Sequence, residues 1–237
     1  MVNYTEAFEK PFTDIKKLLI GILLSIVPII NWFAIGFEMN CSNVGKIKAK
    51  KMPEWKNFGN LFVKGLFNFL IAVIYIIPAI ALVMISAGSV IINILANVPW
   101  DQVSKVSQEE ASAIIQPIIQ AAIPSILAVI PFIILAGILF LIGIYIIPIA
   151  VLSYVENEKF SDAFRLKKVF KKSFTGKYFV AWIAMTALGF VLGAILNFIP
   201  IIGSAAAIFI VGVIGFSLFG QIYLEAEQAK KSKTSKK

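Results

Sequence analysis

The residues of this chain that could do chemistry are few, and they fall into two groups. The first group centres on Glu38, an acid at the end of a long apolar stretch, with Asn31 and Ser42 on the same predicted helix. Glu38 and Ser42 share a helical face at a spacing of four. Ionisable groups inside a membrane are expensive and face a partner or a wet cavity. Glu38, Asn31 and Ser42 are therefore a candidate intramembrane polar site that senses a proton or a cation.

A plainer interpretation of Glu38 stays open. If the helix that carries it surfaces early, the carboxylate is solvated, or it pairs with Lys46 or Lys48 a few positions further along the chain.

The second group is a basic amphipathic segment between Phe160 and Phe174. Four phenylalanines recur near helical spacing, and five cations lie between them: Arg165, Lys167, Lys168, Lys171 and Lys172. A helix of this kind lies in the membrane interface, where its cations attract anionic headgroups. These five residues are candidate contacts for anionic lipids. The alternative is that they only mark the cytoplasmic side and recognise no lipid.

What the sequence lacks excludes several kinds of chemistry. It has no histidine and one cysteine, Cys41, so neither a disulfide framework nor a His/Cys metal site is expected. No phosphate-binding loop, dinucleotide fingerprint, carboxylate pair or serine-nucleophile motif is present. We therefore expect no catalytic residues, no metal and no cofactor. The basic tail at 230–237 has no aromatic residue for base stacking, so nucleic acid is not an expected partner.

Composition defines the class of protein. Of 237 residues, 59% are hydrophobic and 15% are charged, the mean hydropathy is +0.88 and the formal net charge is +9. Soluble domains average about 45–50% apolar and about 25% charged residues. The chain is therefore expected to be an all-α, polytopic bundle of membrane helices.

The candidate membrane spans follow from the uncharged stretches. These stretches are residues 18–37, 65–100, 111–155 and 178–224. Because a crossing needs about 20 residues, the last stretch should hold two crossings, broken near Pro200. The second and third stretches should each hold one crossing with an interfacial extension. Three prolines predict that the segment 114–131 is irregular, either a kinked entry to the span or a helix lying along the outer surface. The predicted spans are 15–28, 31–46, 64–88, 127–152, 178–199 and 203–224.

An internal repeat assigns the first apolar stretch to a hairpin. Gly21–Ile30 aligns with Gly193–Ile202, and both segments end in Pro-Ile-Ile. If the second Pro-Ile-Ile motif closes a helical hairpin, the first should do the same, as a full crossing or as a re-entrant loop. The prediction is then six helices, two of these hairpins and additional interfacial helices.

The distribution of basic residues agrees with this threading. With both termini in the cytoplasm, 21 of the 22 lysines and arginines fall on the cytoplasmic side and only Lys105 lies outside. We expect one membrane domain at 1–229, a disordered basic cytoplasmic tail at 230–237, and a location in the cell membrane.

The N-terminal third of the chain carries a family resemblance. It combines Pro28-Ile29-Ile30-Asn31 with Met52-Pro53-Glu54-Trp55. In this combination the chain resembles a family of uncharacterised, mainly archaeal integral membrane proteins that is known as a domain of unknown function. More distantly, the starts at Thr5 and Ser161 are similar to the membrane domain that accompanies some glycerophosphodiester phosphodiesterases. The resemblance brings no catalytic or binding residues.

Two functions remain open from the sequence. The first is a membrane scaffold or accessory protein that interacts with lipids or with partner proteins, including a second copy of this chain. The alternative is a transporter or channel for a small or lipidic solute with Glu38 in its pathway. An intramembrane enzyme ranks below both, because convergent polar groups are almost absent.

Overall fold

The computed structural model describes residues 2–234, with side chains as far as residue 228, and this part of the chain is helical throughout and contains no β-strand. The prediction of an all-α protein is confirmed for these residues. The elements in chain order are α1 (Tyr4–Glu9), η1 (Lys10–Thr13), α2 (Ile15–Ser25), α3 (Asn31–Asn40), α4 (Phe58–Asn97), α5 (Trp100–Val103), α6 (Gln108–Asn157), η2 (Phe160–Phe164), α7 (Leu166–Ser173), α8 (Gly176–Leu196) and α9 (Ile202–Thr234). Of the expected basic tail, residues 235–237 lie outside the described residues.

Four of these helices are long and apolar enough to cross a membrane: α4, α6, α8 and the part of α9 up to Gln228. The protein is therefore a multi-pass membrane protein. At about 1.5 Å per residue, the 11 residues of α2 and the 10 residues of α3 each extend only about half of a 30 Å hydrocarbon core. These two helices are shorter than the predicted spans, and α3 ends at Asn40 instead of continuing to residue 46.

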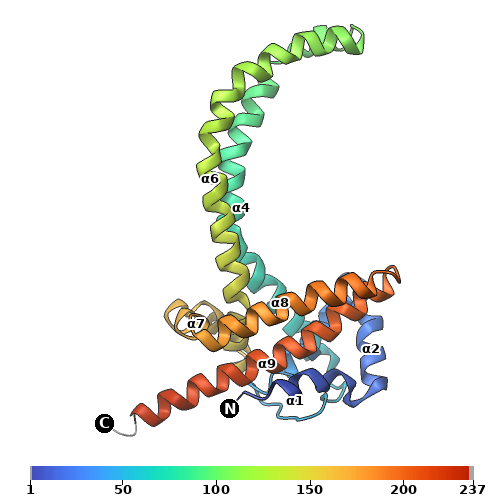
Figure 1. The fold of residues 1–237 in the computed structure, drawn as a ribbon, viewed down its shortest axis with the longest axis vertical. Coiled ribbons are helices and arrows are strands. Elements are labelled where there is room, and N and C mark those ends of the chain that lie inside the picture. Colours follow the sequence, from blue (N-terminus) through green and yellow to red (C-terminus); the bar gives the residue numbers. More distant parts are fainter. Residues whose placement is uncertain (1, 235–237) are drawn as a thin grey trace. The chain divides into compact units, whose positions relative to one another are not determined.

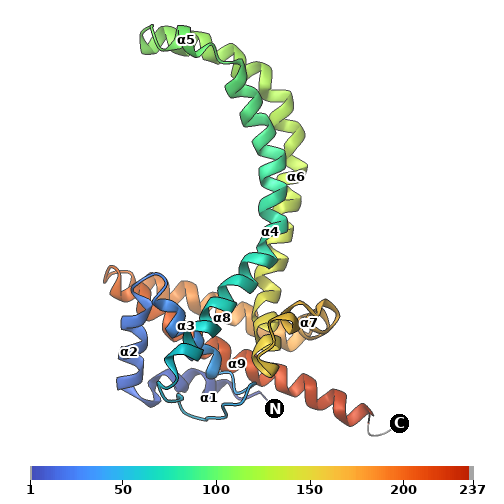
Figure 2. The same cartoon turned by 180° about the vertical axis from the view of Figure 1, so that it is seen from behind.

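The chain divides into two compact units (Figures 1 and 2). Unit 1 comprises Met1–Ala72 and Tyr145–Lys237, and unit 2 comprises Val73–Ile144. Within unit 1, α9 is the central helix: it packs against α1, α2, α3 and α8. In an apolar 18-residue segment of α9, 56% of the residues are buried inside the protein, compared with 11–17% in the corresponding segments of α4, α6 and α8. The core of unit 1 is thus built around α9.

Helix α3 packs closely against the first turns of α4 because glycine replaces side chains at their contact. A Cβ on Gly36 of α3 would lie 2.0 Å from the carbonyl oxygen of Leu61, and a Cβ on Gly65 of α4 would lie 2.0 Å from that of Trp32. Small residues allow backbones of membrane helices to approach in this way. The close approach holds α3, which carries Glu38, in a fixed position between α4 and α9.

The two Pro-Ile turns have the same local backbone. Ile29 and Ile201, each directly after a proline, have φ values of 72° and 65°. In both turns an amide four positions further along donates to a carbonyl: Asn31 to Val27 at 2.9 Å and Gly203 to Ile199 at 2.8 Å. A bond from the amide of residue i+4 to the carbonyl of residue i closes an α-turn, and in both turns it encloses the proline and the residue with positive φ. The aligned residues therefore occupy equivalent positions in two helix-to-helix turns.

Unit 2 consists of the distal part of α4, the short helix α5 and the first part of α6. Both figures show α4 and α6 side by side along this unit. The segment at 114–131 is helical, because α6 continues as one helix through Pro117, Pro124 and Pro131. Prolines are tolerated within membrane helices because neighbouring helices, Ser or Thr side chains and local adjustments of the backbone satisfy the carbonyl groups that a proline leaves free.

Candidate anionic-lipid site at α7

Helix α7 is held between the ends of two candidate membrane spans. Helix α6 ends at Asn157, η2 follows, and α8 begins at Gly176, where the hydroxyl of Thr175 accepts a hydrogen bond from the Tyr178 amide. The connection from α6 turns at Glu158, whose φ is 56°. Because α7 connects the ends of two candidate membrane-crossing helices, α6 and α8, we expect it to lie at the membrane interface.

The side chains of α7 divide among three faces. Val169, Lys172 and Ser173 are buried against the rest of unit 1. Leu166 and Phe170, together with Phe174 after the helix, are exposed at 52%, 38% and 61%. Lys167 and Lys171 are exposed on the adjoining face, also at a spacing of four. An exposed apolar edge beside an exposed basic edge is the arrangement of a helix that lies in the headgroup layer.

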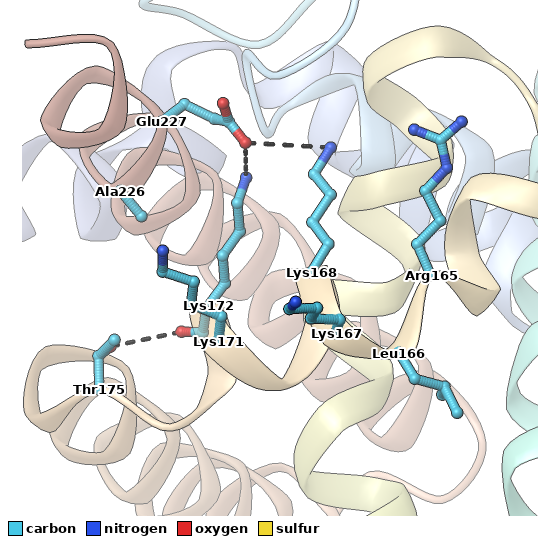
Figure 3. Close-up of a pocket in the computed structure, with 9 residues that line it drawn as sticks. All are labelled: Arg165, Leu166, Lys167, Lys168, Lys171, Lys172, Thr175, Ala226 and Glu227. Atoms are coloured by element: carbon cyan, nitrogen blue, oxygen red, sulfur yellow. Dashed lines mark hydrogen bonds and ion pairs between the residues drawn. The ribbon is translucent and has the colours of Figure 1, made fainter. Parts of the chain in front are cut away.

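Two of the five predicted cations turn inward and pair with acids. Lys172 Nζ lies 2.6 Å from Glu227 Oε1 and 3.0 Å from the centre of the Tyr223 ring. Lys168 forms an ion pair with Glu156 and lies 3.9 Å from Glu227. Figure 3 shows both lysines extended toward Glu227. Burial lowers the pKa of Lys172 to about 8, although Glu227 opposes this shift.

The other three predicted cations face outward. Arg165 forms an ion pair with Asp162 at 3.0 Å. Lys167 and Lys171 have no acidic partner among the described side chains. Two positive charges thus remain uncompensated on α7.

All five predicted cations line one hollow, which we call the α7 hollow (Figure 3). Its volume is about 680 Å³, and the remaining lining residues are Leu166, Thr175, Ala226 and Glu227. The sequence grouped the cations by periodicity alone, and the structure brings them to a single place. Glu156, Tyr223 and Glu227 were missed. A usable signal existed, since Glu156 and Glu227 both lie close to the ends of long apolar stretches, where charged residues meet the interface.

A second charged cluster in unit 1 joins three segments of the chain. Lys64 donates to Asn40 Oδ1 at 2.8 Å and forms an ion pair with Glu158 at 3.3 Å. Lys46 also reaches Glu158, at 2.7 Å. The hydrogen bond from Lys46 is the largest of the causes that lower the pKa of Glu158. This cluster ties the end of α3 to the start of α4 and to the end of α6.

Glu38 is buried, and neither proposed lysine partner reaches it. Its side chain is 4% exposed, and its Oε1 has no hydrogen-bond partner within the described part of the chain. Lys46 pairs with Glu158, and Lys48 donates to the backbone carbonyls of Asn43 and Val44. The plainer interpretation of Glu38, solvated or paired with a lysine, therefore does not describe this structure.

The three residues of the candidate polar site do not converge. The carboxylate of Glu38 lies against Gly212 of α9, whereas the carbonyl of Ser42 lies against Gly220. Those glycines are eight positions apart, about 12 Å along the helix. The Ser42 hydroxyl donates locally, to the Met39 carbonyl at 2.6 Å. Asn31 is at the other end of α3 and leaves its Oδ1 without a partner among the described atoms. No group of three or more potential metal ligands occurs in the described residues.

Comparisons with known proteins give a family. The family model described as "Protein of unknown function (DUF4013)" matches residues 19–201, which is most of the chain. This agrees with the resemblance to a domain of unknown function that the sequence showed, while the archaeal distribution stays a prediction. No curated protein and no solved structure matches the chain.

Proposed function

Because the chain belongs to the family of proteins of unknown function DUF4013, we propose its role from the geometry of α7: it is an accessory or scaffold protein of the membrane that binds anionic lipids. The observation that carries this proposal is the double edge of α7. Leu166 and Phe170 face outward beside Lys167 and Lys171, and the latter two have no acidic partner among the described side chains.

The proposed threading keeps the basic residues on the cytoplasmic side of the cell membrane. Helices α4, α6, α8 and α9 cross, and α2 and α3 form a re-entrant hairpin whose two ends return to the same side. An even number of crossings then leaves both termini in the cytoplasm. The shared turn geometry at Ile29 and Ile201 supports assigning both Pro-Ile motifs to hairpins. In this arrangement α7 faces the leaflet that carries anionic lipids.

Retention of lipids tests the proposal. The protein is reconstituted in nanodiscs of equal phosphatidylcholine and phosphatidylglycerol, released in mild detergent, and weighed by native mass spectrometry. We expect phosphatidylglycerol to be retained in excess. The double variant Lys167→Ala/Lys171→Ala should lose about 2 kcal/mol of this preference, at roughly 1 kcal/mol for each basic residue near the surface.

A matched control removes the same charge elsewhere in unit 1. Lys50 and Lys51 are exposed on the loop before α4, and Lys50→Ala/Lys51→Ala should keep the preference. Equal retention of the two lipids by the unaltered protein would contradict the proposal.

A second candidate function rests on Glu38, whose buried Oε1 has no hydrogen-bond partner among the described residues. In a transporter or channel for a small or lipidic solute, this carboxylate would lie in the pathway. Glu38→Gln keeps the shape of the side chain and removes its charge. A solute flux in proteoliposomes that Glu38→Gln abolishes would favour transport over the accessory role.

A further inference from the structure

We propose that the α7 hollow is a binding site for the headgroup of a phosphate-monoester lipid, such as phosphatidate, in preference to a phosphodiester lipid. This inference rests on the proposed function and makes it more specific: it names the ligand class of the same site. Three features of the hollow support it: its balance of charge, the chemistry of its lining and its position beside an exposed apolar edge.

The balance of charge favours a dianion. Of the five cations that line the hollow, Lys168 and Lys172 are held by Glu156 and Glu227, and Arg165 shares its charge with Asp162. Lys167 and Lys171 are left, one helical turn apart, with no acidic partner in the described part of the chain. A phosphate monoester carries about −1.5 to −2 charges at pH 7. It can neutralise both ammonium groups, whereas a phosphodiester with one negative charge leaves one of them uncompensated.

The inward pairs give the hollow a fixed floor. Lys172 Nζ lies between Glu227 and the Tyr223 ring, and the Tyr223 hydroxyl donates to Glu156 at 3.0 Å. Lys168 reaches the same two acids. The acids that could compete with a phosphate for the outer lysines are therefore already engaged by the inner ones. The network leaves the two outward ammonium groups available to a ligand.

The lining of the hollow favours a lipid over inorganic phosphate. Leu166, Ala226 and the methylene stems of the lysines provide apolar surface around the charged groups. The volume of the hollow is about 680 Å³, which falls within the range of about 300–1,000 Å³ for pockets that bind small organic ligands. An ion as small and as strongly hydrated as phosphate gains nothing from apolar walls. A headgroup attached to a glycerol backbone fills them.

The exposed apolar edge places a lipid in the right orientation. Phe170 and Phe174 stack with their ring centres 5.6 Å apart, next to Leu166. Such an edge enters the boundary between headgroups and acyl chains, by about 5–10 Å for amphipathic interfacial helices. The phosphate of a lipid in that leaflet then lies at the level of Lys167 and Lys171, and its acyl chains continue along the aromatic side chains.

The test measures affinity for four ligands by native mass spectrometry of the full chain in detergent. These are dioctanoyl phosphatidate, dioctanoyl phosphatidylglycerol, dioctanoyl phosphatidylcholine and inorganic phosphate. We expect phosphatidate to bind about tenfold more tightly than phosphatidylglycerol, and inorganic phosphate to bind most weakly. Lys167→Ala/Lys171→Ala should bind both lipids more weakly than the unaltered protein and should bind phosphatidate no more tightly than phosphatidylglycerol. Lys50→Ala/Lys51→Ala should leave the tenfold ratio unchanged.

Each other outcome has a defined meaning. Equal affinity for the two lipids, both above phosphatidylcholine, overturns the inference and leaves the proposed function intact. No preference for either anionic lipid over phosphatidylcholine overturns both. Inorganic phosphate that binds as tightly as phosphatidate overturns the lipid assignment in favour of a soluble phosphate ligand. Thermal unfolding of both double variants confirms that the exposed substitutions leave the fold intact.

Discussion

Unit 1 and unit 2 both contain long apolar helices, yet they differ in how they distribute charge. The charged residues of unit 2 are Lys105, Asp101, Glu109 and Glu110, which give it a net charge of −2. Because the whole chain has a net charge of +9, the residues outside unit 2 have a net charge of +11. Unit 1 engages its charges in ion-pair clusters around Glu158 and Glu227. Unit 2 has no ion pair among its described residues.

The two units also differ in how their helices are packed. In unit 1 glycines bring backbones together, as at Gly36 and Gly220, where a Cβ would lie 2.0 Å from a carbonyl oxygen of another segment. In unit 2 the approach is looser: Gly88 and Gly137 have nothing within 4 Å of such a Cβ, and a Cβ on Gly143 would lie 3.1 Å from the carbonyl oxygen of Tyr75. Many large apolar side chains of unit 2 are exposed, including Met84, Ile85 and Ile92 at about 70%. Unit 1 also exposes large apolar side chains, such as Phe198 at 88% and Phe190 at 77%, so both units need lipid to cover their surfaces, and what distinguishes unit 1 is its close backbone contacts.

The largest difference that we predict between the units is in accessibility. If the positive-inside distribution describes the threading, Lys105 lies outside the cell and Lys167 lies inside. A membrane-impermeant maleimide should label Lys105→Cys in intact cells, and should label Lys167→Cys only after lysis. The natural Cys41 is buried and stays unlabelled in the folded protein. Labelling of both variants in intact cells would contradict the threading.

A pair of glycine substitutions tests the difference in packing. Gly36→Ala places a methyl group 2.0 Å from the backbone of α4 and should destabilise unit 1 by about 3 kcal/mol, as overpacking does. Gly88→Ala, in the open part of α4, should stabilise by about 0.5–1 kcal/mol, because alanine is the better helix former. Chemical denaturation in detergent measures both. A similar loss in the two variants would show that their environments do not differ.

The last difference is a dependence of stability on pH that Lys172 of unit 1 should produce. Burial lowers the pKa of Lys172 from 10.5 to about 8. As the pH rises from 8 to 10.5, the folded protein releases this proton before the unfolded chain does, so the contribution of Lys172 to stability increases. This increase in the contribution of Lys172 to the free energy of unfolding is at most about 3 kcal/mol, and Lys172 contributes little change well below pH 8.

Comparison with a variant isolates this contribution. The unfolding free energy of the unaltered protein, relative to that of Lys172→Met, should rise between pH 8 and pH 10. Lys105→Met, which removes an exposed lysine of unit 2, is the control variant measured over the same range. A constant difference for Lys172→Met would mean that Lys172 keeps its ordinary pKa.

Much of the fold could be predicted from local sequence. The starts of α8 and α9 at residues 176 and 202 lie within two positions of the predicted starts at 178 and 203. The failures have a common cause. The prolines of α6 were expected to make residues 114–131 irregular, and α3 was expected to reach residue 46. Whether a helix continues depends on what surrounds it, and a window of residues does not contain that information.

The candidate site shows the same division. Periodicity alone identified all five cations that line the α7 hollow. It could not distinguish Lys168 and Lys172, which turn inward, from Lys167 and Lys171, which do not. That distinction depends on Glu156 and Glu227, which come from α6 and α9. The grouping of Glu38 with Ser42 stays a prediction, and periodicity could not show that α9 meets these two residues at two different glycines.

The sequence by itself determined that this is a multi-pass helical membrane protein with nearly all of its cations outside residues 73–144. Hydropathy and charge are properties of single residues, and they add up along the chain without reference to folding. Only the tertiary structure decided which of those cations are neutralised and which remain available. An ion pair such as Lys172 with Glu227 joins α7 to α9 and depends on how two helices are rotated against each other. That rotation is set by the packing of side chains far apart in the sequence, as where Gly212 of α9 makes room for Glu38 of α3.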